Sequence, residues 1–99
     1  MTQTELEADV RVDKRLAPLA RVICHDDPVT TMEFVVHVFM DHFRMTYERA
    51  TERMICVHEK GAAVIAHYPL SLAEKRVAKA RGYARANGFP LSFSIEEQD

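Results

Sequence analysis

Hydrophobic and polar positions along the chain predict three strands and three helices. Residues 19–24 form a short apolar run bounded by a polar cluster, which is typical of a buried strand. Residues 62–68 form a second such run, and apolar and polar residues alternate strictly over 91–96, as in a half-buried strand. Helical spacing of apolar residues predicts a core-facing stripe formed by Met32, Val35, Val36, Phe39 and Phe43.

Capping and stop signals predict where the helices begin and end. Residues 30–33 (Thr-Thr-Met-Glu) and 71–74 (Ser-Leu-Ala-Glu) fit capping boxes, in which a hydroxyl accepts from a first-turn amide and a glutamate accepts from the amide of the cap residue. Thr46 can cap a helix that Gly61 terminates, and Asn87-Gly88 is a stop signal for the last helix.

The order of these elements predicts an α+β fold, in which three helices pack on one face of a small three-stranded antiparallel sheet (β-α-α-β-α-β). The expected inner rows of the second and third helices are Ala50, Met54, Val57 and His58, and Ala73, Val77, Ala80 and Ala84. Apolar residues are sparse over 1–18, so we expect a flexible arm there and one folded domain over 19–99.

Composition narrows the classes of function. The chain has 99 residues, of which 47% are hydrophobic, and a net charge of −2, so it lacks the basic excess that nucleic-acid binding usually needs. No apolar run approaches the ~20 residues that span a bilayer, and the amino terminus does not resemble a signal peptide. We therefore expect a cytoplasmic protein without membrane contact, with Cys24 and Cys56 reduced in apolar surroundings.

Candidate chemistry gathers after the first strand, where His25, Asp26 and Asp27 are consecutive. Carboxylates and imidazoles serve as acids, bases and metal ligands, so a small metal-dependent hydrolase using these residues and His58 is one alternative. However, the chain contains neither an H-E-x-x-H nor a C-x-x-C motif, and Cys24 and His25, as adjacent strand residues, point to opposite faces. Binding is therefore favoured over catalysis, with no cofactor and no metal expected.

Three separated motifs carry a resemblance to a known family. They are HDDPVTTMEFVV over 25–36, ERATERMICVHEKG over 48–61 and YARANGFPL over 83–91. In this order and at this spacing they resemble the ClpS adaptor family, over about residues 22–97. The resemblance implies a ClpS-like fold, similar to the carboxy-terminal domain of the ribosomal stalk protein, and a monomeric, non-enzymatic adaptor of the N-end rule pathway.

The resemblance also implies roles for individual residues. Asp27 and His58 would hold the α-ammonium of a substrate, Asp26 would contribute to the same acidic rim, and His25 would occupy the usual asparagine position. The hydrophobic pocket for the first side chain would be formed by Ile23, Thr30, Met32, Met54, Val57 and Leu91. Ser71 and Arg76 stand at positions that contact the unfoldase in family members.

The partners implied are substrates that begin with Leu, Phe, Tyr or Trp (N-degrons) and the amino-terminal domain of a ClpA- or ClpC-type AAA+ unfoldase, which feeds the ClpP peptidase. An alternative remains open. Because His25 offers a different set of donors and acceptors from asparagine, the chain could be an unfoldase-binding modulator in which N-degron binding is weakened or narrowed.

Overall fold

A computed structural model describes residues 18–97 and contains the predicted order of elements. These are β1 (Leu19–His25), α2 (Met32–Phe43), α3 (Tyr47–Lys60), β2 (Ala62–Pro69), α4 (Leu70–Ala86) and β3 (Ser92–Glu97). The arm expected over residues 1–18 lies outside the described residues except for Pro18. The predicted strands and helices all occur, with boundaries that differ by one or two residues.

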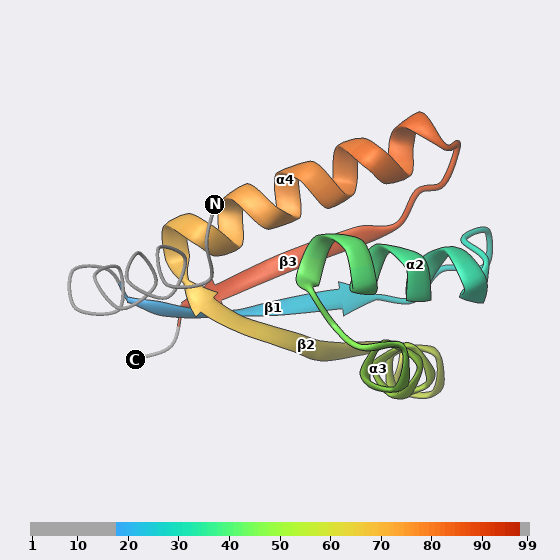
Figure 1. Cartoon of the computed structure of the whole chain (residues 1–99), viewed down its shortest axis with the longest axis horizontal. Coiled ribbons are helices and arrows are strands. Elements are labelled where there is room, and N and C mark those ends of the chain that lie inside the picture. The colour runs from blue at the N-terminus through green and yellow to red at the C-terminus, as the bar shows by residue number, and fades with distance from the viewer. Residues whose placement is uncertain (1–17, 98–99) are drawn as a thin grey trace.

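The three strands form one antiparallel sheet with β1 in the centre, in the order β2-β1-β3 (Figure 1). Cys24 of β1 lies opposite Ala63 of β2 and Phe93 of β3. Alternate residues of β1, namely Ala20, Val22 and Cys24, are fully buried. Because successive strand residues point to opposite faces, one face of β1 is therefore directed into the core.

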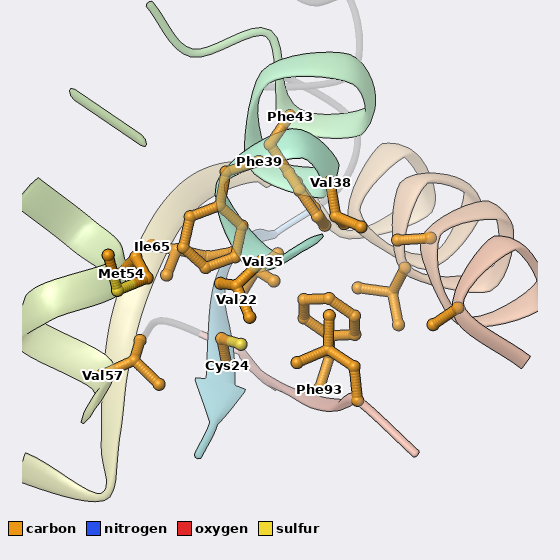
Figure 2. Packing of buried hydrophobic residues seen from close by; sticks show 14 of the residues in the cluster. Val22, Cys24, Val35, Val38, Phe39, Phe43, Met54, Val57, Ile65 and Phe93 are labelled. Atoms are coloured by element: carbon orange, nitrogen blue, oxygen red, sulfur yellow. The ribbon is translucent and has the colours of Figure 1, made fainter. Parts of the chain in front are cut away.

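The helices complete an α+β sandwich, as predicted. Helix α4 contacts all three strands, α3 packs against β2, and α2 packs between α3 and α4. Figure 2 shows Phe39 and Phe43 of α2 reaching into the space between the helices and the sheet, where Val22 and Phe93 lie. Within the described residues, no helix is both long and apolar enough to cross a membrane.

The first turn of α2 differs from the predicted capping box. The hydroxyl of Thr31 accepts a hydrogen bond from the Phe34 amide at 3.2 Å, so Thr31, not Thr30, is the N-cap. The third helical position is consequently Phe34, and Glu33 is not placed to complete a box. The hydroxyl of Thr30 instead donates to the carboxylate of Asp27, within the turn that precedes α2.

The boundaries of α3 agree with the prediction, whereas the start of α4 does not. Thr46 caps α3 through the Arg49 amide, and Gly61 ends this helix at a φ of +86°, where glycine has no steric penalty. Helix α4 begins at Leu70 with no side-chain cap, so the predicted Ser71 capping box is wrong. The Leu70 amide donates instead to the carbonyl of Pro18, a tertiary partner that no local pattern reveals.

The core-facing stripe of α2 also needs correction. Val35, Phe39 and Phe43 are buried as predicted, but Val38 is buried with them because α2 packs against a helix on each side. Met32 is 48% exposed, and Val36 is only partly buried. The expected inner row of α4 is buried throughout, and in α3 all members of the expected row except His58 are buried.

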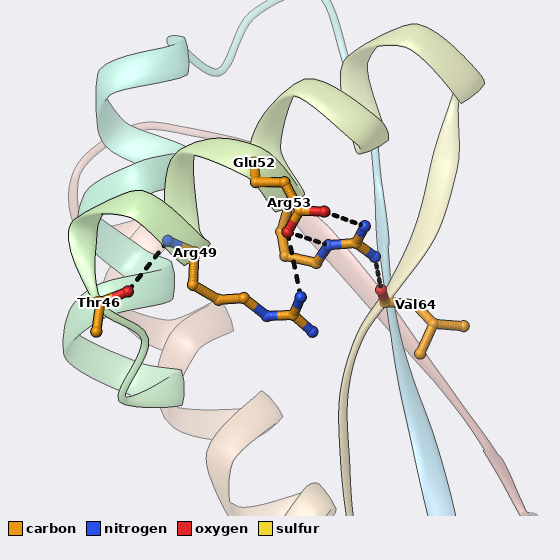
Figure 3. A network of polar contacts seen from close by, with 5 residues as sticks. All are labelled: Thr46, Arg49, Glu52, Arg53 and Val64. Carbon is orange, nitrogen blue, oxygen red and sulfur yellow. Dashed lines mark hydrogen bonds and ion pairs between the residues drawn. The ribbon is translucent and has the colours of Figure 1, made fainter.

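A polar network holds α3 against the sheet (Figure 3). Arg53 donates from Nη1 to the carbonyl of Val64 in β2 at 2.9 Å, and its Nη2 pairs with Glu52 at 2.9 Å. Arg49 also pairs with Glu52, at 3.1 Å. Because Arg53 precedes Met54 by one residue, this anchor helps to set the position of the helix face that carries Met54 and His58.

Candidate functional site

A cavity of about 520 Å³ lies where the turn after β1 meets α2 and α3. This volume is within the range of small-molecule and side-chain binding sites. The turn supplies a polar wall, while α2, α3 and the residue before β3 supply apolar side chains. The lining residues are His25, Asp26, Asp27, Pro28, Val29, Thr30, Thr31, Met32, Val35, Met54, Val57, His58 and Leu91.

Asp26 and His58 form the polar contact at the rim of this cavity. Asp26 follows the end of β1, and His58 lies in the last turn of α3. The Nδ1 atom of His58 is 3.5 Å from Oδ1 of Asp26, and their side chains are 54% and 36% exposed, respectively. Both groups therefore remain accessible to a ligand that enters the cavity.

The carboxylate of Asp27 is engaged by its own turn. It accepts hydrogen bonds from the Val29 amide at 2.9 Å, from the Thr30 amide at 2.7 Å and from the Thr30 hydroxyl at 2.7 Å. Burial by itself would raise the pKa of Asp27, but these hydrogen bonds outweigh it and lower the pKa below its ordinary value of 3.8. Asp27 and His58 were both expected to hold a substrate ammonium group, and the aspartate that lies beside His58 in the structure is Asp26.

His25, at the end of β1, reaches the rim of the cavity from the sheet. Its Nε2 atom is 2.8 Å from the hydroxyl of Ser94 in β3. One ring nitrogen is therefore already in a hydrogen bond, which leaves a single nitrogen of His25 for another partner. No sequence motif indicated the contact with Ser94, because the two residues are brought together by pairing of β1 with β3.

The inner part of the cavity is apolar. Met54, Val57 and Leu91 are buried, whereas Met32, in the first turn of α2, lines the cavity with a largely exposed side chain. Leu91 is held in place by Arg85, whose guanidinium donates to the Leu91 carbonyl at 2.8 Å. A ligand can consequently meet polar groups at the rim and hydrocarbon further inside.

The cavity includes every predicted pocket residue except Ile23. Ile23 alternates with the buried Val22 and Cys24 along β1, so its side chain points to the opposite face of the sheet. The prediction missed Pro28, Val29, Thr31 and Val35. Val35 is buried in the core as predicted, and its position one helical turn after Met32 is the signal that could have indicated its place in the cavity wall as well.

Neither of the two predicted docking residues lines the cavity. Ser71 is exposed near the start of α4. Arg76 is partly buried and donates from Nη1 to the carbonyl of His42 at 3.1 Å, while its guanidinium carbon lies 5.4 Å from the ring centroid of Tyr68. Arg76 thus links α4 to α2, in addition to any external contact that it makes.

The hydrolase alternative needs several metal-ligating side chains that converge on one point. Across residues 18–97, no group of three or more histidine, cysteine, aspartate or glutamate side chains is arranged to hold an ion. His25 is directed to Ser94 and Asp27 to Thr30, so of the four residues considered only Asp26 and His58 form a pair. Nothing in this arrangement favours metal chemistry.

Comparison with known proteins identifies the family to which this chain is similar. Residues 15–94 match the model of "ATP-dependent Clp protease adaptor protein ClpS". The ClpS adapter of Oleidesulfovibrio alaskensis is 44% identical over 96 residues, covering 95% of this chain and 92% of that protein. The ClpS adapter of Nitratidesulfovibrio vulgaris (Miyazaki F) is 40% identical over 96 residues, which cover 97% of this chain and 92% of the relative.

A solved structure agrees with these matches. Agrobacterium tumefaciens ClpS2 bound to L-phenylalaninamide superposes with a TM-score of 0.79 at 31% identity, covering 82% of this chain and 98% of that one. The chain therefore belongs to the ClpS family of ATP-dependent Clp protease adaptor proteins.

Proposed function

We propose that this adaptor, which is not itself a peptidase, binds the free amino terminus of proteins that begin with Leu, Phe, Tyr or Trp. It then delivers them to the amino-terminal domain of a ClpA- or ClpC-type unfoldase for degradation by ClpP. The observation that carries this proposal is the pair Asp26–His58 at the rim of a cavity with an apolar interior. A cation and a large apolar side chain on the same residue would satisfy both parts at once.

The polar rim of the cavity fits an α-ammonium group. This group has three N–H donors and a full positive charge, and charge-assisted hydrogen bonds to a carboxylate are the strongest that it can make. In our proposal Asp26 supplies the carboxylate and neutral His58 supplies a nitrogen acceptor. Asp27 holds the turn and adds negative charge nearby, and His25 contributes through the ring nitrogen that Ser94 does not engage.

The apolar interior of the cavity fits the side chain of the first residue of the substrate. Burial of a leucine- or phenylalanine-sized group gives about 1.5–3 kcal/mol, and flexible methionines adapt to both shapes. Met54, Val57 and Leu91 would contact the buried end of that side chain, while Met32 at the opening would exclude β-branched residues. The relative from Agrobacterium supports this assignment, because L-phenylalaninamide combines an α-amino group with an aromatic side chain.

Calorimetry with short peptides tests the proposal. Peptides that begin with Phe or Leu should bind, whereas the same peptides with an acetylated amino terminus should not, because acetylation removes the charge. Peptides beginning with Val are the matched control for the exclusion by Met32. Equal affinity for free and acetylated peptides would contradict the proposed role of the rim.

Delivery to the unfoldase requires a second surface, for which we propose Ser71 and Arg76 on α4. Ser71 is the better residue to vary, since it is exposed and does not cap α4. Ser71→Arg should weaken binding to the amino-terminal domain of ClpA or ClpC and leave peptide affinity unchanged. Unaltered unfoldase binding would remove Ser71 from the docking surface.

The modulator alternative is favoured by one observation, the hydrogen bond between His25 and Ser94. If that contact withdraws His25 from the ligand, N-degron binding is weaker than with an asparagine at this position. His25→Asn should then raise the affinity for Phe-first peptides. An unchanged or lower affinity would favour the full adaptor function.

A further inference from the structure

We propose that a second cavity, between the first two turns of α2 and those of α3, is a subsite for an apolar side chain at the third position of the substrate. The inference rests on the proposed function, because it needs the first residue to be bound in the large cavity. It adds a specificity determinant outside that cavity, formed mainly by Val36, Tyr47 and Thr51.

The second cavity has a volume of about 230 Å³, less than half that of the first. It is lined by Met32, Glu33, Val36, Tyr47, Thr51 and Met54. Tyr47 is 61% exposed and Met32 is 48% exposed, so two large apolar side chains border the cavity without being covered by the rest of the described fold. Such an exposed apolar surface next to a binding cavity is typical of a contact with a ligand.

The two cavities adjoin each other, since Met32 and Met54 line both. Along α3, His58 and Val57 belong to the first cavity, Met54 is shared, and Thr51 and Tyr47 belong to the second. At about 1.5 Å per residue, the midpoint between Thr51 and Tyr47 lies roughly 7.5 Å from Met54 along the helix axis. The second cavity lies on the far side of the first cavity from His58.

This separation selects a position in the substrate. In an extended peptide, side chains two residues apart point to the same face and are about 7 Å apart, whereas adjacent side chains point to opposite faces. A peptide with its ammonium at Asp26 and His58 and its first side chain beside Met54 would therefore direct its third side chain toward Tyr47. The second side chain would face away from the protein.

The chemistry of the lining indicates what the subsite accepts. The side chains of Met32, Val36 and Met54 are apolar, and the ring of Tyr47 offers a further apolar surface. Methionines on the shared wall can move to adapt to either occupant, because an unbranched thioether has three rotatable bonds. A leucine-sized side chain at the third position would bury hydrocarbon here, whereas alanine would leave the cavity open.

Three peptides that differ only at the second and third positions test the proposal. Binding of Phe-Ala-Ala-Gly, Phe-Leu-Ala-Gly and Phe-Ala-Leu-Gly would be measured by calorimetry on the full chain. We expect leucine at the third position to increase affinity about five- to tenfold over alanine, and leucine at the second position to change it less than about twofold. A larger gain from the second position would overturn the assignment.

Variants of Tyr47 test whether the gain in affinity from leucine at the third position arises in the second cavity. Tyr47→Ala should reduce the preference for leucine at the third position to about twofold or less, while Tyr47→Phe should retain it, because the ring is kept. Ile55→Ala is the matched control, since Ile55 is also exposed on α3 but lines neither cavity. A preference that survives Tyr47→Ala, or that Ile55→Ala abolishes equally, would overturn the subsite.

Failure of the subsite differs from failure of the proposed function. If Phe-Ala-Ala-Gly binds and its acetylated form does not, but leucine at the third position adds nothing, only the subsite is wrong. If none of the Phe-first peptides binds, or if acetylated peptides bind equally well, the proposed function and the subsite are both wrong.

Discussion

Oδ1 of Asp26 lies 3.5 Å from Nδ1 of His58, whereas the carboxylate of the adjacent Asp27 accepts three hydrogen bonds from Val29 and Thr30. Two neighbouring residues of the same type thus have different surroundings. Asp26 is available at the rim of the cavity, while Asp27 stabilises the turn that leads to α2. The difference leads to separate predictions for the two aspartates.

Asp26→Asn should weaken binding of a Phe-first peptide about 10- to 100-fold, because a charge-assisted hydrogen bond to the ammonium group is worth about 1.5–3 kcal/mol. Calorimetry at fixed ionic strength would measure the change. Glu59→Gln is the matched control: it removes the same charge from an exposed residue next to His58 that lines neither cavity. Equal losses in the two variants would point to general electrostatics and not to a direct contact.

Asp27→Ala should lower the free energy of unfolding by about 1–2 kcal/mol at pH 7, because the Val29 and Thr30 amides lose their acceptor. The pKa of Asp27 is lowered in the folded state, so its contribution is complete above the unfolded value of 3.8 and is lost as the pH falls through the lower folded value. Denaturant unfolding of wild type and variant should therefore converge in strong acid. A difference that does not depend on pH would contradict this account.

His42 should make the free energy of unfolding depend on pH in a higher pH range than Asp27 does. Burial lowers its pKa below the ordinary 6.5, Asp41 opposes this shift, and His37, Arg76 and Lys79 add to it. The folded state therefore binds this proton less well than the unfolded state, so the stability that neutral His42 contributes is lost as the pH falls from about 6.5 through the lowered folded pKa.

Replacement of the imidazole tests this contribution. His42→Asn should flatten the decline in the free energy of unfolding between pH 7 and pH 5, as measured in denaturant titrations. His67→Asn, at an exposed position of β2, controls for the loss of one histidine. If both variants change the slope equally, the effect does not come from the packing of α2 against α4.

The two thiols should differ in reactivity. Burial, together with the negative charges of Asp27 and Asp26, raises the pKa of Cys24 to about 12, and only the thiolate is strongly nucleophilic. Cys56 is a free, partly exposed thiol on α3. At pH 8 an aromatic disulfide reagent should modify Cys56 first and Cys24 only after unfolding. Cys56→Ser should remove the fast phase, and fast modification of Cys24 in that variant would contradict the prediction.

Much of the fold could be predicted from local patterns. Alternation in β3, the inner alanine row of α4, the Thr46 cap and the Gly61 stop depend on spacing and backbone preference, which operate within a few residues. Two of the errors occurred where a distant segment takes over a local role. The Pro18 carbonyl replaces the expected Ser71 cap at the start of α4, and packing against two helices changes which residues of α2 are buried.

For the candidate site, the sequence by itself determined the inventory: a His-Asp-Asp turn before a helix, methionines at helical spacing and a histidine near the end of α3. Only the tertiary structure decided that Asp26 is the aspartate beside His58 and that Ser94 engages His25. The physical reason is that spacing along the chain determines the face on which a side chain lies. Which side chains then meet depends on the path of the turn and on the packing of strands and helices that are distant in sequence.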